Sequence, residues 1–217
     1  MRRRLLLLAV GTLLAAAPLA FARADDDAHD EHHEHAGHAL EGAAPSDRSL
    51  YGLPGSWSDQ NARPFELGSL RGSPVLLVLF YGTCDSICPV VVRDMQKVEA
   101  MLSPDDRRRT RFVLVTIDPK VDTPEKLHAY AEKHDLDLAR WTLLNGPPEQ
   151  VRVLANVLGF KYRPTGTGQY SHTIRIHVLD REGVVVDHAD GLERSLEPIA
   201  ARVSTLLASE TAPAPAR

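Results

Sequence analysis

The sequence predicts an α/β fold in which a central mixed sheet is flanked by helices on both faces. Apolar runs of strand length alternate with amphipathic stretches of helical length through the middle of the chain. A hairpin pattern follows them, and a last amphipathic stretch closes the folded part. Residues 46–209 are numerous enough to form one domain with its own hydrophobic core.

The first strand, helix and strand are predicted from apolar patterning and one proline. Residues 75–81 and 111–117 are almost uninterrupted apolar runs, which are typical of strands buried on both faces. Residues 90–102 have a helical period. Pro89 fits a helix only in its first turn, where its missing N–H costs nothing, so this helix should begin near residue 86.

The next three elements continue the same alternation. Thr123 is a favourable helix N-cap and is followed by proline, so a helix is expected over 124–134. A short apolar run predicts a strand at 141–144, and a periodic stretch predicts a helix at 149–158.

The folded part ends with a predicted hairpin and helix. Residues 173–179 and 184–187 are expected to pair across a turn at 180–183. Residues 193–207 have the pattern of a closing helix. The tail at 210–217 is rich in alanine and proline and is expected to be disordered.

Cys84 and Cys88 are the only cysteines of the chain, and they lie between the first predicted strand and helix. A cysteine pair at such a junction indicates a thioredoxin-like arrangement, although three residues separate the pair here instead of the usual two. At helical spacing their Cα atoms lie ~6 Å apart, which permits a disulfide and also lets two thiolates bind one soft metal ion. Both chemistries stay open at this point.

The position of the pair favours reactive sulfur over a structural staple. A disulfide that closes about five residues would stabilise the fold by only ~2 kcal/mol. Cys84 should lie just before the helix and Cys88 in its first turn, where unpaired N–H groups and the helix dipole favour thiolate. Thiolate is the form of cysteine that attacks a disulfide or binds a metal ion.

Residues 1–24 have the pattern of a secretory signal peptide. Arg2, Arg3 and Arg4 precede an apolar stretch that ends in small residues, so cleavage is expected after Ala24. The folded part should therefore be exported to a bacterial periplasm, or stay anchored to the inner membrane if the leader is not cleaved. Disulfide and copper chemistry both suit that compartment.

Residues 25–45 form an arm rich in histidine, aspartate and glutamate and almost free of large apolar residues. This composition cannot build a core and predicts disorder. Five of the ten histidines lie in the arm, so it is either a loose collector of Cu(II), Zn(II) or Ni(II), or a solvated acidic tether. The sequence leaves both interpretations open.

The charge of the chain excludes two classes of partner. The formal net charge is −4, and without the arginine-bearing leader and the acidic arm the rest is close to neutral. Nucleic-acid binding and binding to an anionic membrane surface would require a basic patch, and the sequence shows none. Any membrane attachment would depend on an uncleaved leader.

Three motifs at the ends of predicted elements carry the functional information. They read TCDSICP at 83–89, DPKVDTP at 118–124 and YSH at 170–172. Together they resemble the SCO/SenC family of copper chaperones, thioredoxin-like proteins of cytochrome c oxidase assembly. That family is marked by a TxCxxxCP-like motif, a DPxxDTP segment and a histidine far downstream, just before a strand. The resemblance covers residues 46–208.

The resemblance implies a copper site made of Cys84, Cys88 and His172, with Asp118 or Asp122 shaping its surroundings. Two thiolates and an imidazole suit Cu(I), and the same set can hold Cu(II) with an extra ligand. Structural zinc would want four protein ligands, and the motifs offer no obvious fourth. From the residues alone, turn and helix-start chemistry explains the two aspartates equally well.

Two features depart from the commoner family pattern. Gly82 stands where many members have a threonine, two residues before the first cysteine. The histidine motif is Ser171-His172-Thr173 instead of Asp-His-Ser. The residues that the resemblance implies as ligands are nevertheless all present.

The remaining histidines of the folded part have weaker claims to a site. His177 shares a strand face with Arg175, opposite the apolar face, so it is expected at the surface or beside the site. His128 and His134 lie in a polar helix and are expected to be solvated, while His188 has no partner that its spacing identifies.

Two main functions follow from the same sulfur pair. The first is a copper chaperone that delivers copper to the binuclear centre in the copper-bearing subunit of cytochrome c oxidase, or to another copper protein, with a thiol–disulfide reductant as a further partner. The second is a thiol–disulfide oxidoreductase that reduces cysteines of an oxidase subunit or another exported protein. A thiol peroxidase would also need hydroxyl and guanidinium donors at one cysteine, and Thr83 and Arg93 are the nearest in sequence.

Overall fold

The structure is a computed structural model that describes residues 48–166, 168–192 and 195–209. These residues belong to the second of two units into which the chain divides, Leu40–Arg217. The expected signal peptide at 1–24, the arm at 25–45 and the tail at 210–217 lie outside the described residues.

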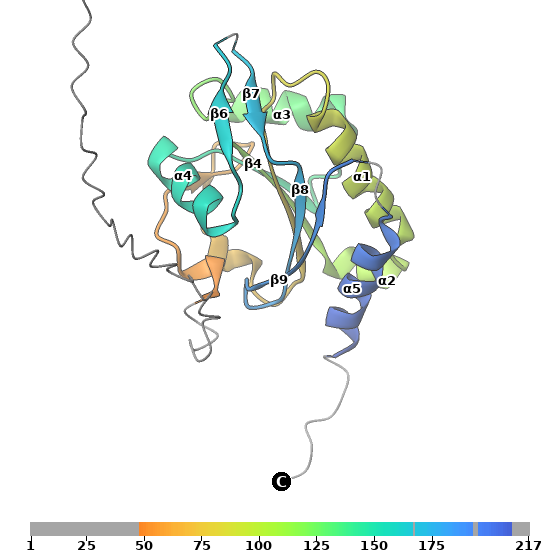
Figure 1. Cartoon of the computed structure of the whole chain (residues 1–217). Helices are drawn as coiled ribbons and strands as arrows, with labels where there is room; N and C mark the ends of the chain where they lie inside the picture. Colours follow the sequence, from red (N-terminus) through yellow and green to blue (C-terminus); the bar gives the residue numbers. More distant parts are fainter. Residues whose placement is uncertain (1–47, 167, 193–194, 210–217) are drawn as a thin grey trace, which may run out of the picture. The chain divides into compact units, whose positions relative to one another are not determined.

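A five-stranded mixed sheet forms the centre of the fold, with the strand order β5-β4-β3-β8-β9 (Figure 1). The parallel strands are β3 (Val75–Phe80), β4 (Arg111–Thr116) and β5 (Trp141–Leu144). Two antiparallel strands, β8 (Arg175–Leu179) and β9 (Val185–Asp190), complete the sheet on the other side of β3. This arrangement confirms the predicted α/β class with a central mixed sheet.

Helices cover both faces of the sheet. They are α1 (Cys88–Met101), α2 (Pro104–Arg109), α3 (Pro124–Lys133), α4 (Pro148–Val157) and α5 (Glu197–Ala208). The crossovers β3-α1-β4 and β4-α3-β5 advance in the same direction, so the right-handed rule puts α1 and α3 on one face. Helix α5 packs against α1, and Figure 1 shows α4 on the opposite side of the sheet.

Two short hairpins lie outside the central sheet. One pairs β1 (Trp57–Ser58) with β2 (Pro64–Phe65), and the other pairs β6 (Tyr162–Pro164) with β7 (Tyr170–His172). Two 3-10 turns, η2 (Leu50–Gly52) and η3 (Leu67–Leu70), accompany the first hairpin in the chain. The β6–β7 hairpin matters for function because its last residue is His172.

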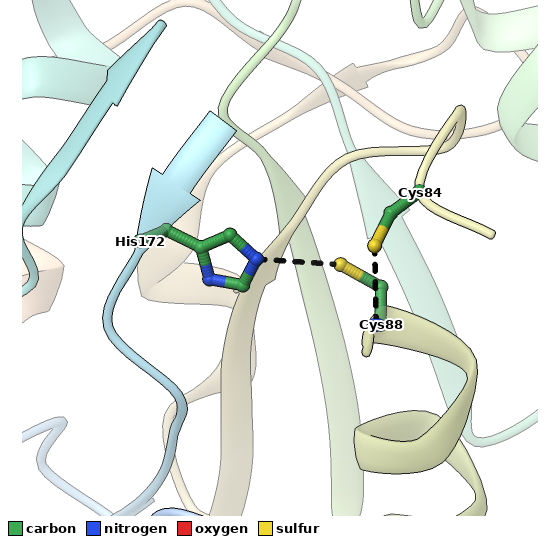
Figure 2. A group of neighbouring side chains, drawn as sticks. All are labelled: Cys84, Cys88 and His172. Atoms are coloured by element: carbon green, nitrogen blue, oxygen red, sulfur yellow. Dashed lines mark hydrogen bonds between the residues drawn. The ribbon is translucent and has the colours of Figure 1, made fainter. Parts of the chain in front are cut away.

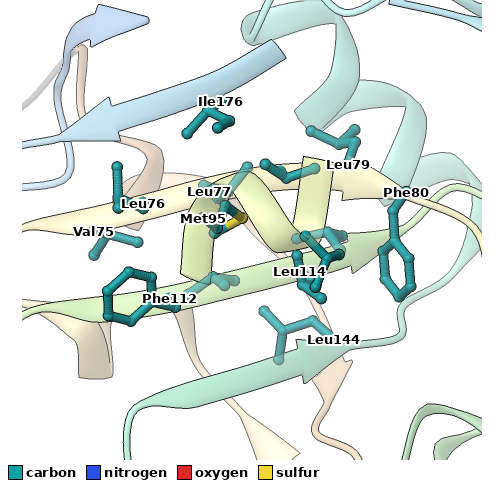
Figure 3. Close-up of a cluster of buried hydrophobic side chains, with 14 of the residues drawn as sticks. Val75, Leu76, Leu77, Leu79, Phe80, Met95, Phe112, Leu114, Leu144 and Ile176 are labelled. Atoms are coloured by element: carbon teal, nitrogen blue, oxygen red, sulfur yellow. The ribbon is translucent and has the colours of Figure 1, made fainter. Parts of the chain in front are cut away.

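The core lies on both faces of β3, whose six residues are all buried (Figure 3). Continuous burial explains why this strand is an unbroken apolar run, since both its faces meet packed layers. On neighbouring strands, the rings of Phe112 and Trp141 stack with centroids 4.9 Å apart. Phe80 packs against Tyr130 of α3 with centroids 5.0 Å apart.

Several element boundaries differ from the sequence prediction. Helix α1 begins at Cys88, two residues later than expected, and Pro89 lies in its first turn. The hairpin strand expected from residue 173 begins at Arg175, because the Thr173 N–H donates to the Lys161 carbonyl next to the β6–β7 hairpin and not to β9. Helix α5 begins at Glu197, four residues later than expected. Helix α2 and the strands of the two short hairpins have too few residues to produce a recognisable period.

The surface position expected for His177 is wrong, because this side chain is only 1% exposed. His177 lies opposite Leu77 and His188 in the strand register, on an internal strand whose two faces are both covered. Polar residues at alternate positions therefore do not mark a solvent face here. Burial, followed by the charge of Arg175, lowers the pKa of His177 from 6.5 to about 4.

None of the helices in the described part of the chain combines the length and the apolar character that crossing a bilayer requires.

Candidate metal centre

The loop after β3, the start of α1 and the end of β7 bring a Cys-Cys-His cluster together (Figure 2). Cys84 lies in the loop after β3, Cys88 is the first residue of α1, and His172 is the last residue of β7. One donor atom from each residue lies within 4.8 Å of the other two. The residues predicted from the motifs thus converge, although 84 positions separate Cys88 from His172.

The cysteine pair is buried and shares one proton. The backbone N–H of Cys88 donates to Cys84 Sγ at 3.3 Å, and the Cys84 N–H donates to the Tyr81 carbonyl at 3.2 Å. The hydrogen bond from the Cys88 thiol lowers the pKa of Cys84 to about 4, while donating that bond, together with burial, raises the pKa of Cys88. Cys84 is therefore the thiolate of the pair and Cys88 the thiol. Cys88 lies in the first turn of α1 yet has a raised pKa, so the thiolate expected from helix-start chemistry at both cysteines is found at Cys84 alone.

The ring of His172 is oriented by its own neighbour in the chain. Its Nδ1 lies 2.7 Å from the carbonyl oxygen of Thr173, and a carbonyl can only accept a hydrogen bond, so Nδ1 carries the proton. Nε2 is then the lone-pair nitrogen and lies 3.9 Å from Cys88 Sγ. A histidine whose second nitrogen is held in this way is prepared as a ligand.

Aromatic rings hold His172 on two sides. Phe160 stacks on the imidazole, with centroids 5.8 Å apart and an interplanar angle of 19°, and Tyr81 meets it edge-on at 5.7 Å. The Tyr81 hydroxyl donates to Gln169 Oε1 at 2.7 Å, and the Tyr170 backbone N–H donates to that hydroxyl at 3.4 Å. Sequence reasoning missed Phe160, Tyr81 and Gln169, because no motif marks them as neighbours of His172, whereas Tyr170 lies in the YSH motif.

The donor set fits one soft metal ion. Metal–sulfur and metal–nitrogen bonds of ~2.0–2.3 Å at trigonal angles would separate the donors by about 3.5–4 Å. The 3.9 Å between Cys88 Sγ and His172 Nε2 is already in that range. Among the described residues, no fourth histidine, cysteine or carboxylate joins the cluster. Two sulfurs and one imidazole are a ligand set for Cu(I), whereas structural zinc uses four ligands.

The SCO1/SenC family model matches residues 44–208, which is most of the chain. The chain belongs to the SCO1/SenC family. A protein of Stutzerimonas stutzeri named for copper binding is 30% identical over 151 residues, or 65% of this chain and 72% of that protein. The predicted family is therefore confirmed.

Solved structures of Sco proteins share the fold of this chain. Bradyrhizobium japonicum ScoI with copper bound is 27% identical with a TM-score of 0.60, and the match covers 70% of this chain and 97% of that one. BsSco, described as a member of the Sco family of cytochrome c oxidase assembly proteins with a disulfide switch, is 22% identical with a TM-score of 0.62, covering 72% and 93%. These neighbours confirm the thioredoxin-like fold.

The unusual glycine of this SCO1/SenC protein has a structural cause. The Gly82 N–H donates to Asp122 Oδ2 at 2.9 Å, and a Cβ at Gly82 would lie only 2.8 Å from Asp122 Oδ1. Asp122 is buried and also accepts a hydrogen bond from the Thr116 hydroxyl, and burial raises its pKa. Asp122 therefore anchors the loop that leads to Cys84, and only a residue without a side chain leaves room for it.

Asp118 takes a different position from Asp122. Its side chain is half-buried and lines a cavity together with Tyr170, outside the donor cluster. Its backbone carbonyl accepts from the N–H groups of Val121 and Asp122, and its own N–H donates to the Thr116 hydroxyl. It thus shapes the turn before α3, as turn chemistry predicts.

The other histidines of the described residues lie away from the donor cluster. His128 is half-exposed, 3.2 Å from Asn61 and 3.5 Å from Glu132. The ring of His134 packs on Tyr130 at 4.2 Å, and its partial burial lowers its pKa. It is therefore less solvated than expected. His188 does have a partner, since its Nε2 lies 3.5 Å from Asp190.

Proposed function

We propose that this protein is a copper chaperone that holds copper through Cys84, Cys88 and His172. It delivers the ion to the binuclear copper centre of cytochrome c oxidase. The observation that carries the proposal is the convergence of two sulfurs and a lone-pair imidazole nitrogen, with Nε2 oriented by the Nδ1–Thr173 hydrogen bond. A soft donor set of this kind favours Cu(I), and a further ligand would let it hold Cu(II).

Different observations support the cellular compartment, the copper cargo and the protein that receives the copper. The leader pattern at residues 1–24 supports export to the periplasm, or attachment to the inner membrane through an uncleaved leader. A relative named for copper binding and a 27% identical Sco protein solved with copper support the cargo. The description of a family member as a cytochrome c oxidase assembly protein supports the recipient.

Redox chemistry of the sulfur pair couples to copper binding. Oxidation forms the Cys84–Cys88 bond while two electrons and the single proton of the pair pass to an acceptor disulfide, which takes a second proton from solvent and becomes two thiols. The disulfide lacks thiolate and cannot hold Cu(I), so oxidation releases the ion. A thiol–disulfide reductant of the same compartment must then restore the pair before the next copper ion binds.

An anaerobic Cu(I) titration tests the proposal. The full chain is used with the five histidines of residues 25–45 replaced by alanine, so that the arm cannot contribute ligands. We expect one Cu(I) per chain, bound at least tenfold more weakly after His172→Ala, while Cys88→Ser abolishes tight binding. His188→Ala is the matched control and should bind as the parent does. Affinity unchanged by His172→Ala would contradict the proposed site.

A second function, thiol–disulfide oxidoreductase, is favoured by the low pKa of Cys84, about 4. A thiolate next to a resolving thiol can attack the disulfide of a partner, and Cys88 then closes the intramolecular bond and releases the reduced partner. This chemistry does not use His172. The enzyme would be favoured over the chaperone by three results together. Metal-free protein would reduce disulfides rapidly, His172→Ala would keep that activity, and the wild type would bind Cu(I) only weakly.

A further inference from the structure

We propose that the surface on both sides of β6 is the docking site for an acidic segment of the copper acceptor, one that inserts an apolar side chain. The proposal rests on the proposed function, because it names the kind of partner that approaches the same metal centre. The surface consists of two cavities and four cationic side chains, and we call it the β6 surface.

The larger cavity has a volume of about 600 Å³ and lies between α4, the β4–α3 loop and the β6–β7 hairpin. Aromatic and apolar groups form much of its wall, among them Ile117, Phe160, Tyr162 and Tyr170. A concave apolar wall of this size has room for one or two side chains of a partner.

The smaller cavity, of about 410 Å³, lies on the other side of β6 and shares Lys161 and Tyr162 with the larger one. His172 is one of its lining residues. The larger cavity reaches the same imidazole through Phe160, which stacks on it. A partner seated on the β6 surface therefore touches the residues around the metal ligand directly.

Cations surround both cavities. Lys120 and Arg152 lie at the larger one, Arg163 lies at the smaller one, and Lys161 lies between them. In the described residues, only Arg152 of these four has an ion-pair partner, Glu149 at 4.0 Å. Asp118 is the one acidic side chain in the two linings. A largely unpaired cationic rim in a nearly neutral folded part indicates an acidic partner.

Two exposed apolar side chains lie on the neighbouring face of α4. Val153 and Val157 are 47% and 54% exposed, and each follows a residue that lines the larger cavity, Arg152 and Asn156. Val153 and Val157 are four positions apart and share one face of α4, about 100° around the helix from Arg152 and Asn156, so they form an apolar strip next to the cavity and not part of its wall. The β6 surface thus has an apolar centre and a charged rim, which is the usual composition of an interface with a protein partner.

The first test is independent of copper. Metal-free full chain is titrated with a capped acidic pentapeptide, Asp-Glu-Phe-Glu-Asp, and amide shifts are followed by NMR. We expect the largest shifts around Tyr162, Tyr170 and His172, and none of comparable size with the charge-reversed peptide Lys-Arg-Phe-Arg-Lys. The double variant Lys120→Glu/Lys161→Glu should weaken binding of the acidic peptide at least tenfold. Equal binding of both peptides, or shifts confined to other regions, would overturn the inference.

The second test measures transfer from copper-loaded full chain to the soluble copper domain of cytochrome c oxidase. Lys120→Glu/Lys161→Glu should lower the second-order rate constant about tenfold at low ionic strength, with the difference shrinking at high salt. Arg71→Glu/Arg108→Glu is the matched control. It makes the same change in net charge just after η3 and in α2, at the end of the sheet opposite the metal centre, and should leave the rate unchanged.

The outcomes separate this inference from the proposed function. If wild type binds no copper or passes none, the proposed function fails, and the peptide titration still decides the chemistry of the surface. If wild type transfers copper and both double variants transfer it equally fast, the docking surface is refuted while the function stands. Sedimentation that shows a dimer abolished by Lys120→Glu/Lys161→Glu would assign the surface to a second copy and overturn the proposal.

Discussion

The proton on Nδ1 decides what the imidazole of His172 can do. Nδ1 donates that proton to the carbonyl oxygen of Thr173, 2.7 Å away, so Nε2 faces Cys88 with a free lone pair. No charged group is needed for this orientation, because a backbone carbonyl next in the chain supplies it. A change of residue at position 173 would therefore leave the tautomer of His172 intact as long as the backbone keeps its course.

Gly82→Ala tests the steric reason for the unusual residue before the cysteines. The new methyl group would overlap Asp122 Oδ1, so the loop or the carboxylate must move, and we expect a loss of about 1–3 kcal/mol in the free energy of unfolding. Gly68→Ala is the control, because a Cβ at Gly68 would meet no atom within 4 Å. In an Asp122→Ala background, Gly82→Ala should cost much less. An equal cost in both backgrounds, measured by urea unfolding, would contradict the explanation.

His177→Leu tests the buried histidine of β8. Native His177 stays neutral down to pH about 4, whereas the unfolded residue takes up a proton below ~6.5. Stability is thus lost as pH falls from ~6.5 to ~4, by up to about 1.4 kcal/mol per pH unit. His177→Leu should remove that contribution and be at least as stable at neutral pH, because a buried nitrogen without a partner disappears.

Urea unfolding of wild type and His177→Leu between pH 4 and 7.5 measures how much stability each protein loses in acid. His188→Leu, on the neighbouring strand, controls for the loss of one titratable ring from a half-exposed site. If His177→Leu keeps the wild-type loss of stability in acid, the buried imidazole is not its source.

At the scale of elements, the β6–β7 hairpin is a support for one ligand. In the described part of the chain its two strands pair with each other and with no further strand. Its contacts with the core include Phe160 and Tyr81, whose rings contact His172, and the hydrogen bond of the Tyr81 hydroxyl to Gln169. The cysteines, in contrast, are fixed by the junction of β3 and α1. The metal centre therefore combines a rigid sulfur pair with an imidazole held by side-chain packing.

Tyr81→Phe should loosen the hairpin without removing the ring that meets His172. The hydroxyl bonds to Gln169 and to the Tyr170 N–H are lost, at a cost of about 1 kcal/mol, so Cu(I) affinity should fall about fivefold. Tyr162→Phe is the matched control, because the structure records no hydrogen bond of its hydroxyl among the described residues. Anaerobic competition titrations with a Cu(I) chelator measure the Cu(I) affinity of both variants. Equal affinities of the two variants would show that the hydroxyl does not position His172.

At the scale of the whole molecule, the sequence predicts best what depends on continuous local patterns. The run at 75–81 identifies β3 because it is buried on both faces, and Pro89 places the start of α1 within two residues. The β6–β7 hairpin stays unpredicted, since its strands have three residues each and it packs against Tyr81, which is far away in the chain. Burial of His177 likewise depends on what covers the sheet, which no local pattern contains. The convergence on His172 needed the family resemblance.

Copper binding should stabilise the whole domain, because the site joins segments that are 84 residues apart and exists only in the folded chain. Free Cu(I) at 100 times its Kd stabilises the native state by about 2.7 kcal/mol, if the unfolded chain binds none. For a domain of this size that raises Tm by roughly 5–10 °C. The unfolded chain retains its two cysteines, which reduces the shift, but it cannot add His172 to them.

Differential scanning calorimetry measures the rise in Tm when reduced protein is loaded with copper. The five histidines of residues 25–45 are again replaced by alanine. His172→Ala should lose most of the shift, since its native site is no better than the unfolded cysteine pair. The Cys84–Cys88 disulfide form should show no shift at all, because it offers no thiolate. A copper-dependent rise in Tm that survives both changes would mean that the ion binds elsewhere in the folded chain.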